Sequence, residues 1–177
     1  EQILSPCQAI GKLLIWDGCD SAAWDKLYKV KLFKGRRYPF GVLHEDLNFT
    51  SKLFSESDKI VLTGMPLYNY LIRENSICNK PFTTQKFDIY EQAKLNCQFV
   101  RDTYKELEEK AKYFLFRCTC TLLQSASDAA QISEKDLKRV KELARTQLST
   151  AILNRFVPLG ERKYYFELLY KVCIKKK

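Results

Sequence analysis

Residues 41–49 read Gly-Val-Leu-His-Glu-Asp-Leu-Asn-Phe. This stretch places two adjacent carboxylates, Glu45 and Asp46, and the chain's only histidine, His44, at the start of an apolar-periodic segment. Leucine and phenylalanine recur at helical spacing from there to Ser55, and negative charge in a first turn suits the helix dipole. The stretch therefore predicts a helix over residues 45–55 that begins at the acidic pair.

Two further motifs flank this helix. Residues 24–28 read Trp-Asp-Lys-Leu-Tyr, and residues 70–77 read Tyr-Leu-Ile-Arg-Glu-Asn-Ser-Ile. Between the helix and the second motif, residues 59–63 form a β-branched run, and a turn separates them from the aromatic, alternating residues 67–72. This pattern predicts two short strands.

The apolar period becomes helical near Thr83 and stays helical to the end of the chain. A 3-4-3-4 stride from Tyr90 to Cys118 predicts one long amphipathic helix or two collinear ones. Ser133 is placed to cap the next helix, and residues 158–160 interrupt the pattern before a final aromatic and basic helix. The sequence thus predicts an α+β front, residues 1–80, and an all-α back, residues 81–177.

Taken in order, the three front motifs resemble the second half of a family 2 glycosyltransferase of the GT-A fold. The resemblance implies a partial GT-A fold, with the acceptor-side half and a few short strands over 1–80, followed by the helical C-terminal region. It also implies a fragment of an inverting enzyme that moves a sugar from a nucleotide diphosphate sugar to a carbohydrate or lipid-linked acceptor. Surface polysaccharide biosynthesis is the pathway expected by analogy.

The resemblance assigns roles to seven residues. Asp46 is the expected catalytic base, with an acceptor site around it and further contacts to the substrate or its diphosphate. The acceptor-binding residues are Glu45, His44 and Trp24, and the substrate or diphosphate contacts are Lys26, Tyr28 and Arg73. Plain structural roles remain the alternatives: a helix start for the acidic pair, core packing for Trp24, and an ion pair for Arg73.

The resemblance also implies a divalent cation, Mg or Mn, held by a D-x-D motif in the intact enzyme. This chain has no D-x-D, because Asp17 and Asp20 have the wrong spacing and Glu56 stands where the motif needs Asp. We therefore expect no metal or other cofactor bound by this fragment, a missing nucleotide-binding half, and no activity of the chain alone. The chain begins at Glu1, and we favour a piece cut from a longer protein over a processed product.

Charge and cysteine content suggest partners and location. The formal charge is +9, and residues 134–177 hold 12 basic and 5 acidic side chains. An anionic membrane surface is one expected partner, and a homodimer another; nucleic acid is not favoured. The rival function is a non-catalytic helical module that binds an anionic partner through this region, and a solvated helix face is the plain alternative. Seven cysteines without a C-x-x-C pair favour free thiols and a cytoplasmic location, with the inner face of the membrane as a variant.

Overall fold

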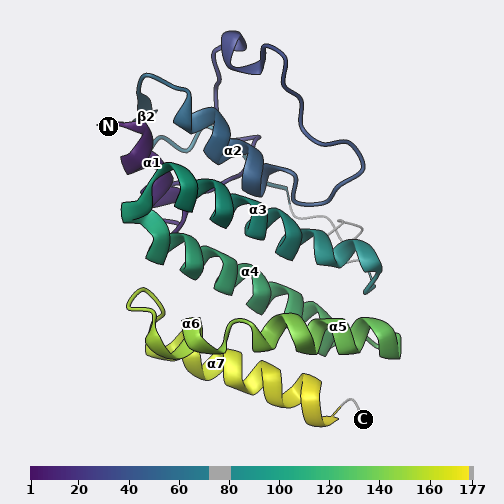
Figure 1. The fold of residues 1–177 in the computed structure, drawn as a ribbon. Helices are drawn as coiled ribbons and strands as arrows, with labels where there is room; N and C mark the ends of the chain where they lie inside the picture. Colours follow the sequence, from purple (N-terminus) through teal and green to yellow (C-terminus); the bar gives the residue numbers. More distant parts are fainter. Residues whose placement is uncertain (72–80, 176–177) are drawn as a thin grey trace.

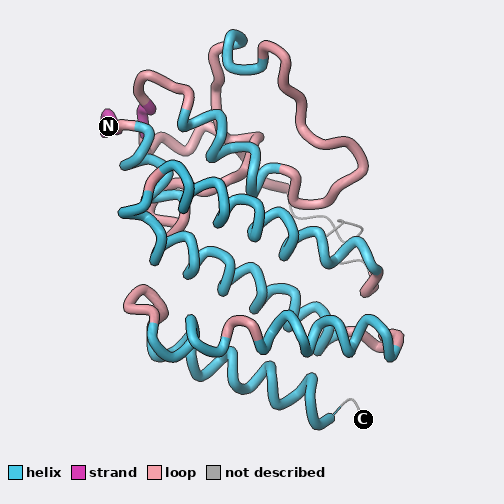
Figure 2. Tube along the Cα trace, viewed as in Figure 1, coloured by secondary structure: helices cyan, strands magenta, loops and turns pink. Residues whose placement is uncertain are grey.

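The computed structural model describes residues 1–71 and 81–175, and its architecture is mostly helical (Figures 1 and 2). The α-helices are α1 (Pro6–Leu13), α2 (Asp46–Ser55), α3 (Asp88–Thr103), α4 (Glu108–Asp128), α5 (Glu134–Arg145), α6 (Leu148–Leu153) and α7 (Leu159–Tyr170). Within the described residues the shorter helical elements are the 3-10 turns η1 (Val30–Phe33), η3 (Thr84–Phe87) and η4 (Lys105–Leu107) and the π-helical turn η5 (Lys171–Lys175). The strands are β1 (Gln2–Leu4) and β2 (Ile60–Leu62).

The predicted partial GT-A fold is wrong. In the described part of the chain the one sheet has two antiparallel strands, in which Gln2 pairs with Leu62 and Leu4 with Ile60. The predicted strand over 59–63 forms as β2, but the described residues 67–71 of the second predicted strand are not a strand. All five side chains are exposed, so this segment has no buried face that would hold it in register beside another strand. Tyr68 and Tyr70 stack on Trp24 instead.

The stride from Tyr90 to Cys118 belongs to two helices that lie side by side, not to one helix or a collinear pair. The α-helical backbone ends at Tyr104, whose φ of −135° and ψ of 77° are not helical. The short turn η4 then reverses the chain, and α4 runs back along α3 (Figure 1). Leu107 within the turn is buried, so the apolar pattern continues from α3 into α4 without interruption. The pattern alone therefore does not show that the helix ends here.

Two helix starts, those of α1 and α5, follow local signals. Ser5 caps α1 as part of a capping box: the Gln8 N–H donates to Ser5 Oγ at 3.3 Å, and the Ser5 N–H donates to Gln8 Oε1 at 2.9 Å. The predicted Ser133 cap is confirmed, because the Asp136 N–H donates to Ser133 Oγ at 3.1 Å. Side-chain caps of this kind satisfy backbone donors that a helix start leaves open, so they are visible in sequence.

The core centres on α4, which contacts α3, α5, α6 and α7. Phe114 and Phe116 of α4 are fully buried, and the Tyr165 hydroxyl of α7 donates to the Ala144 carbonyl at 2.6 Å. The same apolar cluster includes residues from both sides of position 80, so the front packs directly on the helical back. The division of the chain at residue 80 itself stays a prediction.

Candidate active site around Asp46

A tight turn over residues 41–46, the acidic turn, leads into α2. His44 has a φ of +57°, a left-handed backbone that non-glycine residues adopt uncommonly. Its carbonyl accepts from the Leu47 N–H at 3.2 Å, which joins the turn to the first turn of the helix. The Leu43 N–H donates to Asp88 Oδ2 at 2.9 Å, so the start of α3 holds the turn in place. The acidic pair is therefore fixed to two helices.

Asp46 is half-buried, and its carboxyl has an unusual pKa. Burial and the neighbouring charge of Glu45 raise the pKa of Asp46 from 3.8 to about 6, while the backbone N–H groups of Asp46 and Leu47 pull it down. A carboxylate with a pKa of about 6 is still ionised at neutral pH and accepts a proton more readily than an ordinary aspartate. The arrangement suits a general base, and the catalytic role of Asp46 stays a prediction.

The raised pKa predicts that Asp46 lowers the stability of the folded chain at neutral pH. Because the folded pKa lies above the ordinary value, this cost is absent below about pH 4, grows as pH rises, and is complete above about pH 6. Two pKa units correspond to at most about 3 kcal/mol, and solvent around a half-exposed carboxyl reduces this to about 1–2 kcal/mol. Asp46→Asn is therefore expected to raise the free energy of unfolding at pH 7 by about 1 kcal/mol, measured by urea denaturation.

The matched control for this prediction is Asp58→Asn, since the Asp58 side chain is 81% exposed. We expect it to leave the unfolding free energy nearly unchanged at both pH 4 and pH 7. At pH 4 the gain from Asp46→Asn should also shrink toward zero. A loss of stability in Asp46→Asn at pH 7 would show that the carboxylate stabilises the helix start instead.

His44 lies beside the acidic pair as a half-buried imidazole. Burial lowers the pKa of His44, and the positive charge of Lys86 lowers it further. The imidazole is therefore neutral at pH 7, when it can both donate and accept a hydrogen bond. A neutral imidazole beside a carboxylate can hydrogen-bond to hydroxyl groups, and the acceptor-binding role of His44 stays a prediction.

Aromatic side chains pack against one face of α2. Tyr38 stacks on Phe49 with ring centroids 4.3 Å apart, and Tyr28 meets Phe33 edge-on at 5.6 Å. Burial raises the pKa of both phenols, and the charge of Asp46 adds to the effect on Tyr38. Tyr28 is thus part of a small aromatic core under the helix, and Tyr38, which the motifs did not single out, is close enough to Asp46 to feel its charge.

Lys26 is tied into the loop that carries Trp24. Its ammonium donates to the Ala22 carbonyl at 2.7 Å, to Asp25 Oδ1 at 2.5 Å and to Asp20 Oδ1 at 3.2 Å. These three acceptors match the three donors of an ammonium group, and the side chain is only 12% exposed. In this conformation Lys26 shapes the loop, and contact with a diphosphate would require it to give up these bonds.

Trp24, in contrast, is exposed and stacks with two tyrosines from a distant loop. Its ring centroid lies 4.4 Å from that of Tyr68 and 5.3 Å from that of Tyr70. Arg73, the last of the predicted contacts, lies outside the described residues. The structure therefore brings the predicted residues into one front region, around α2 and the loop before it, with Arg73 unplaced.

Sequence reasoning missed Tyr38, Tyr68, Tyr70 and Asp88. The two tyrosines from the distant loop carried a signal, because aromatic residues on an alternating polar segment are unusual for a solvent-facing loop. Asp88 carried none, since its contact with the acidic turn spans 45 positions and no local pattern encodes it.

The described residues offer no metal site, because no group of three or more His, Cys, Asp or Glu side chains is arranged to hold an ion. The described residues do not fit the divalent cation that the resemblance implies, and metal binding by the intact protein stays a prediction.

A groove of about 270 Å³ between α4 and α7 lies apart from these residues and is lined by none of them. Its two charged side chains pair with each other, since Arg117 lies 3.8 Å from the Glu161 carboxylate. The same carboxylate accepts a hydrogen bond from the Tyr113 hydroxyl at 2.9 Å. The Arg117 guanidinium also stacks 3.4 Å above the Trp16 ring. These contacts fasten α7 to the front of the molecule, which is a sufficient role for the groove.

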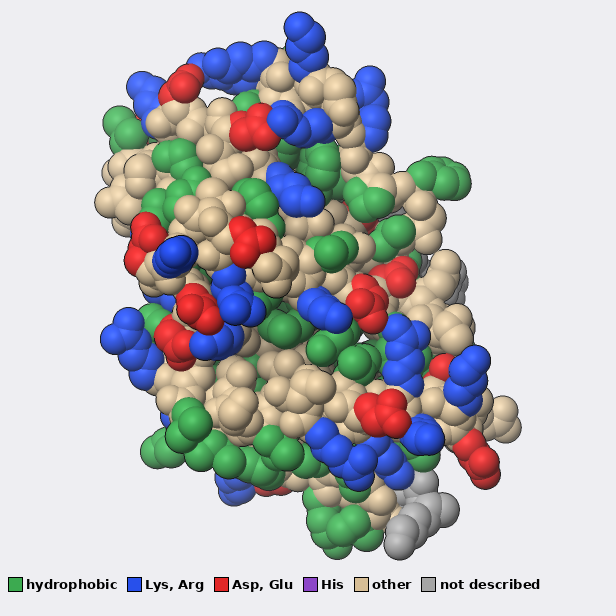
Figure 3. All heavy atoms as spheres, in the orientation of Figure 1, with side chains coloured by type: hydrophobic (Ala, Val, Ile, Leu, Met, Phe, Trp, Pro, Cys, Tyr) green, Lys and Arg blue, Asp and Glu red, His purple; other side chains and the backbone are tan. Residues whose placement is uncertain are grey.

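The basic C-terminal region presents both charge and apolar surface (Figure 3). Lysine and arginine side chains gather over α5, and apolar side chains are exposed near α6 and α7, namely Ile152, Leu153, Leu159, Phe166, Tyr170 and Ile174. Within 1–71 and 81–175, no helix is both long and apolar enough to cross a membrane. Binding of an anionic membrane surface stays a prediction.

Comparison with known proteins finds a partial relative. Glycosyltransferase GlyA of Streptococcus pneumoniae serotype 4 (strain ATCC BAA-334 / TIGR4) is 39% identical over 56 residues. The match covers 32% of this chain and 8% of GlyA, so this chain spans only a small share of that relative's length. No family model matches the chain, and no solved structure matches it. The similarity points to a glycosyltransferase and gives no finer class.

Proposed function

We propose that this chain is the acceptor-side part of a glycosyltransferase in which Asp46 is the general base. The observation that carries the proposal is the 39% identity to glycosyltransferase GlyA over 56 residues. The half-buried carboxyl of Asp46, with a pKa of about 6, supports the assignment of the base. Perturbed carboxyl groups of this kind are enriched at functional sites.

The proposed reaction is an inverting transfer. The acceptor hydroxyl oxygen attacks the anomeric carbon of the donor sugar and forms the new C–O bond, while the bond from that carbon to the diphosphate oxygen breaks. The diphosphate leaves with the bonding electrons, and the hydroxyl proton passes to the Asp46 carboxylate. A base placed in this way is typically worth a factor of about 10²–10⁴ in rate.

The finer features of the proposal follow the resemblance of the three front motifs to family 2 enzymes. The donor is a nucleotide diphosphate sugar, and the acceptor is a carbohydrate or lipid-linked glycan in surface polysaccharide biosynthesis. Charge on the leaving diphosphate must be stabilised by cationic groups or a metal ion, and we assign this task to residues of the intact enzyme outside the described part.

The test is an assay of the intact protein for acceptor-dependent release of nucleoside diphosphate. The donors are a panel of uridine and guanosine diphosphate sugars, with soluble saccharides as acceptors. We expect release with at least one donor, and we expect it to depend on the acceptor. Failure of every donor, with the protein folded, would contradict the proposed function.

A further inference from the structure

Three aromatic side chains, Trp24, Tyr68 and Tyr70, form an exposed cluster that we call the aromatic platform. Trp24 lies on the loop before α2, and the tyrosines lie on the loop after β2. The tryptophan ring is tilted by 32° to one tyrosine and by 35° to the other. The exposed fractions are 46%, 50% and 59%, so a large aromatic surface faces solvent.

Exposed aromatic surface of this kind is uncommon on a protein that has no ligand to cover it. Scattered single apolar residues are normal on a protein surface, but a contiguous patch usually marks a binding site. Here two loops more than 40 positions apart meet to build the patch, and the ring stacking fixes their relative position. The platform is therefore a built feature, whereas an isolated exposed ring such as Phe40 is not.

The charges around the platform restrict its ligand. Asp25 follows Trp24 directly, and the Lys26 ammonium bridges Asp25 and Asp20. The negative charge of Asp20 also reaches Asp46, whose neighbour is Glu45. The carboxyl groups of Asp20 and Asp25 thus outnumber the one ammonium between them, and this excess of negative charge beside Trp24 disfavours an anionic ligand such as a phosphate, a nucleic acid or an acidic lipid.

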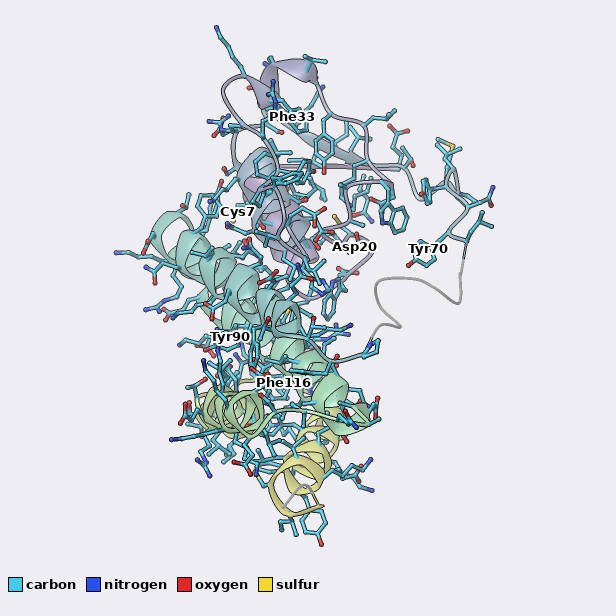
Figure 4. All side chains as sticks on the ribbon, turned by 90° about the vertical axis from the view of Figure 1, so that its right-hand side faces the viewer. Cys7, Asp20, Phe33, Tyr70, Tyr90 and Phe116 are labelled. Atoms are coloured by element: carbon cyan, nitrogen blue, oxygen red, sulfur yellow. The ribbon has the colours of Figure 1, made fainter. Side chains whose placement is uncertain are left out.

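Figure 4 shows Asp20 and Tyr70 on the same side of the molecule, with Tyr70 further out toward solvent. The Asp20 carboxylate on the inner side and the Tyr70 ring on the outer side give this surface both a hydrogen-bond acceptor and a flat apolar face. A pyranose ring has the complementary character, because its C–H face is apolar and its edge carries hydroxyl donors. The face of an aromatic ring carries negative potential, which attracts the weakly positive C–H hydrogens.

We propose that the aromatic platform of Trp24, Tyr68 and Tyr70 binds a neutral pyranose ring of the acceptor glycan by stacking, with the nearby carboxylates accepting from its hydroxyl groups. The inference rests on the proposed glycosyltransferase function, which it extends by assigning two further residues and a substrate class. It requires a neutral saccharide, and it makes Tyr68 and Tyr70 binding residues without a part in the chemical step.

The test follows the two indole N–H signals of the chain by ¹H–¹⁵N NMR, since Trp16 and Trp24 are the only tryptophans. The probes are cellobiose, lactose and N,N′-diacetylchitobiose, with a glucuronic-acid-containing disaccharide as the anionic comparison. We expect at least one neutral disaccharide to shift the Trp24 signal in a saturable way while the Trp16 signal stays in place. The uronic-acid disaccharide is expected to bind more weakly.

Variants separate binding from loop packing. Tyr68→Ala and Tyr70→Ala are each expected to weaken binding by about fivefold, the usual worth of one aromatic contact. Tyr68→Phe keeps the ring and should bind nearly as wild type, and Phe166→Ala on α7 is a matched exposed control. Asp58→Asn, which changes an exposed carboxylate outside the platform, should keep the Trp24 shift.

Two results with the wild-type chain would overturn the platform while leaving the proposed function to its own turnover assay. One is a Trp24 signal that no neutral disaccharide shifts, and the other is stronger binding of the uronic-acid disaccharide. Unchanged affinity in both alanine variants would likewise contradict the stacking role. Near-UV circular dichroism of each variant checks that the fold is retained.

Discussion

Asp46→Asn in the intact protein is expected to lower turnover by about two to four orders of magnitude. Asparagine keeps the size and hydrogen-bonding shape of the side chain but cannot take the proton from the acceptor hydroxyl. Donor affinity is expected to change little, because the proposed base contacts the acceptor. The measurement is the initial rate of nucleoside diphosphate release at saturating donor and acceptor.

The control for this variant is Asp58→Asn, which removes an exposed carboxylate outside the acidic turn and leaves the proposed base in place. It is expected to leave turnover nearly unchanged. Near-normal turnover in Asp46→Asn would show that the acidic pair only begins a helix. Loss of turnover combined with raised stability would match the pattern of a functional residue that costs the fold.

The second large effect is expected in the core. Phe114→Ala should lower the free energy of unfolding by about 3–5 kcal/mol, because the ring is fully buried in α4 and its loss leaves a cavity. For a chain of this length each kcal/mol corresponds to about 2–4 °C in Tm, so a fall of about 10 °C is expected. The measurement is urea and thermal denaturation followed by far-UV circular dichroism.

Phe40→Ala is the matched control, since the Phe40 ring is fully exposed. We expect its unfolding free energy to stay within about 0.5 kcal/mol of wild type. The same fall in both variants would contradict the central position of α4. A fall in Phe114→Ala alone, in one cooperative transition, would support a core shared by the front and the back of the chain.

Local signals predicted some helix starts. The Ser133 cap acts within one turn of α5, so the sequence near that start is sufficient, whereas α7 already begins at Leu159, inside the predicted break over 158–160. The start of α2 at the acidic pair was predicted for the same reason. The starts of these helices depend on interactions between residues that are close in the sequence.

The failures have long-range causes. The break at Tyr104 is hidden, because Leu107 in the turn is as buried as a helical residue in the same stride. Residues 67–71 have the alternating pattern of a strand, but the Tyr68 and Tyr70 rings contact Trp24 and the segment pairs with no strand of the described residues. The resemblance to GT-A enzymes also led to the prediction of a partial GT-A fold, whereas the described residues form a two-stranded sheet only.

The candidate site was predicted only as a set of residue types. The motifs pointed to Asp46 and its neighbours, and burial with the charge of Glu45 then gives that carboxyl its raised pKa. The sequence could not reveal that the Lys26 ammonium is occupied by three acceptors, or that Asp88 holds the acidic turn. Both depend on how loops close in space.

The most direct measurement of the central claim is the pH dependence of kcat/KM for the acceptor at saturating donor. Because the base works only when ionised, the rate is expected to fall about tenfold per pH unit below a midpoint near pH 6, the pKa of Asp46. Asp46→Asn should retain no such limb in its residual activity. A rate that stays level down to pH 5, or a limb that persists unchanged in Asp46→Asn, would contradict Asp46 as the base.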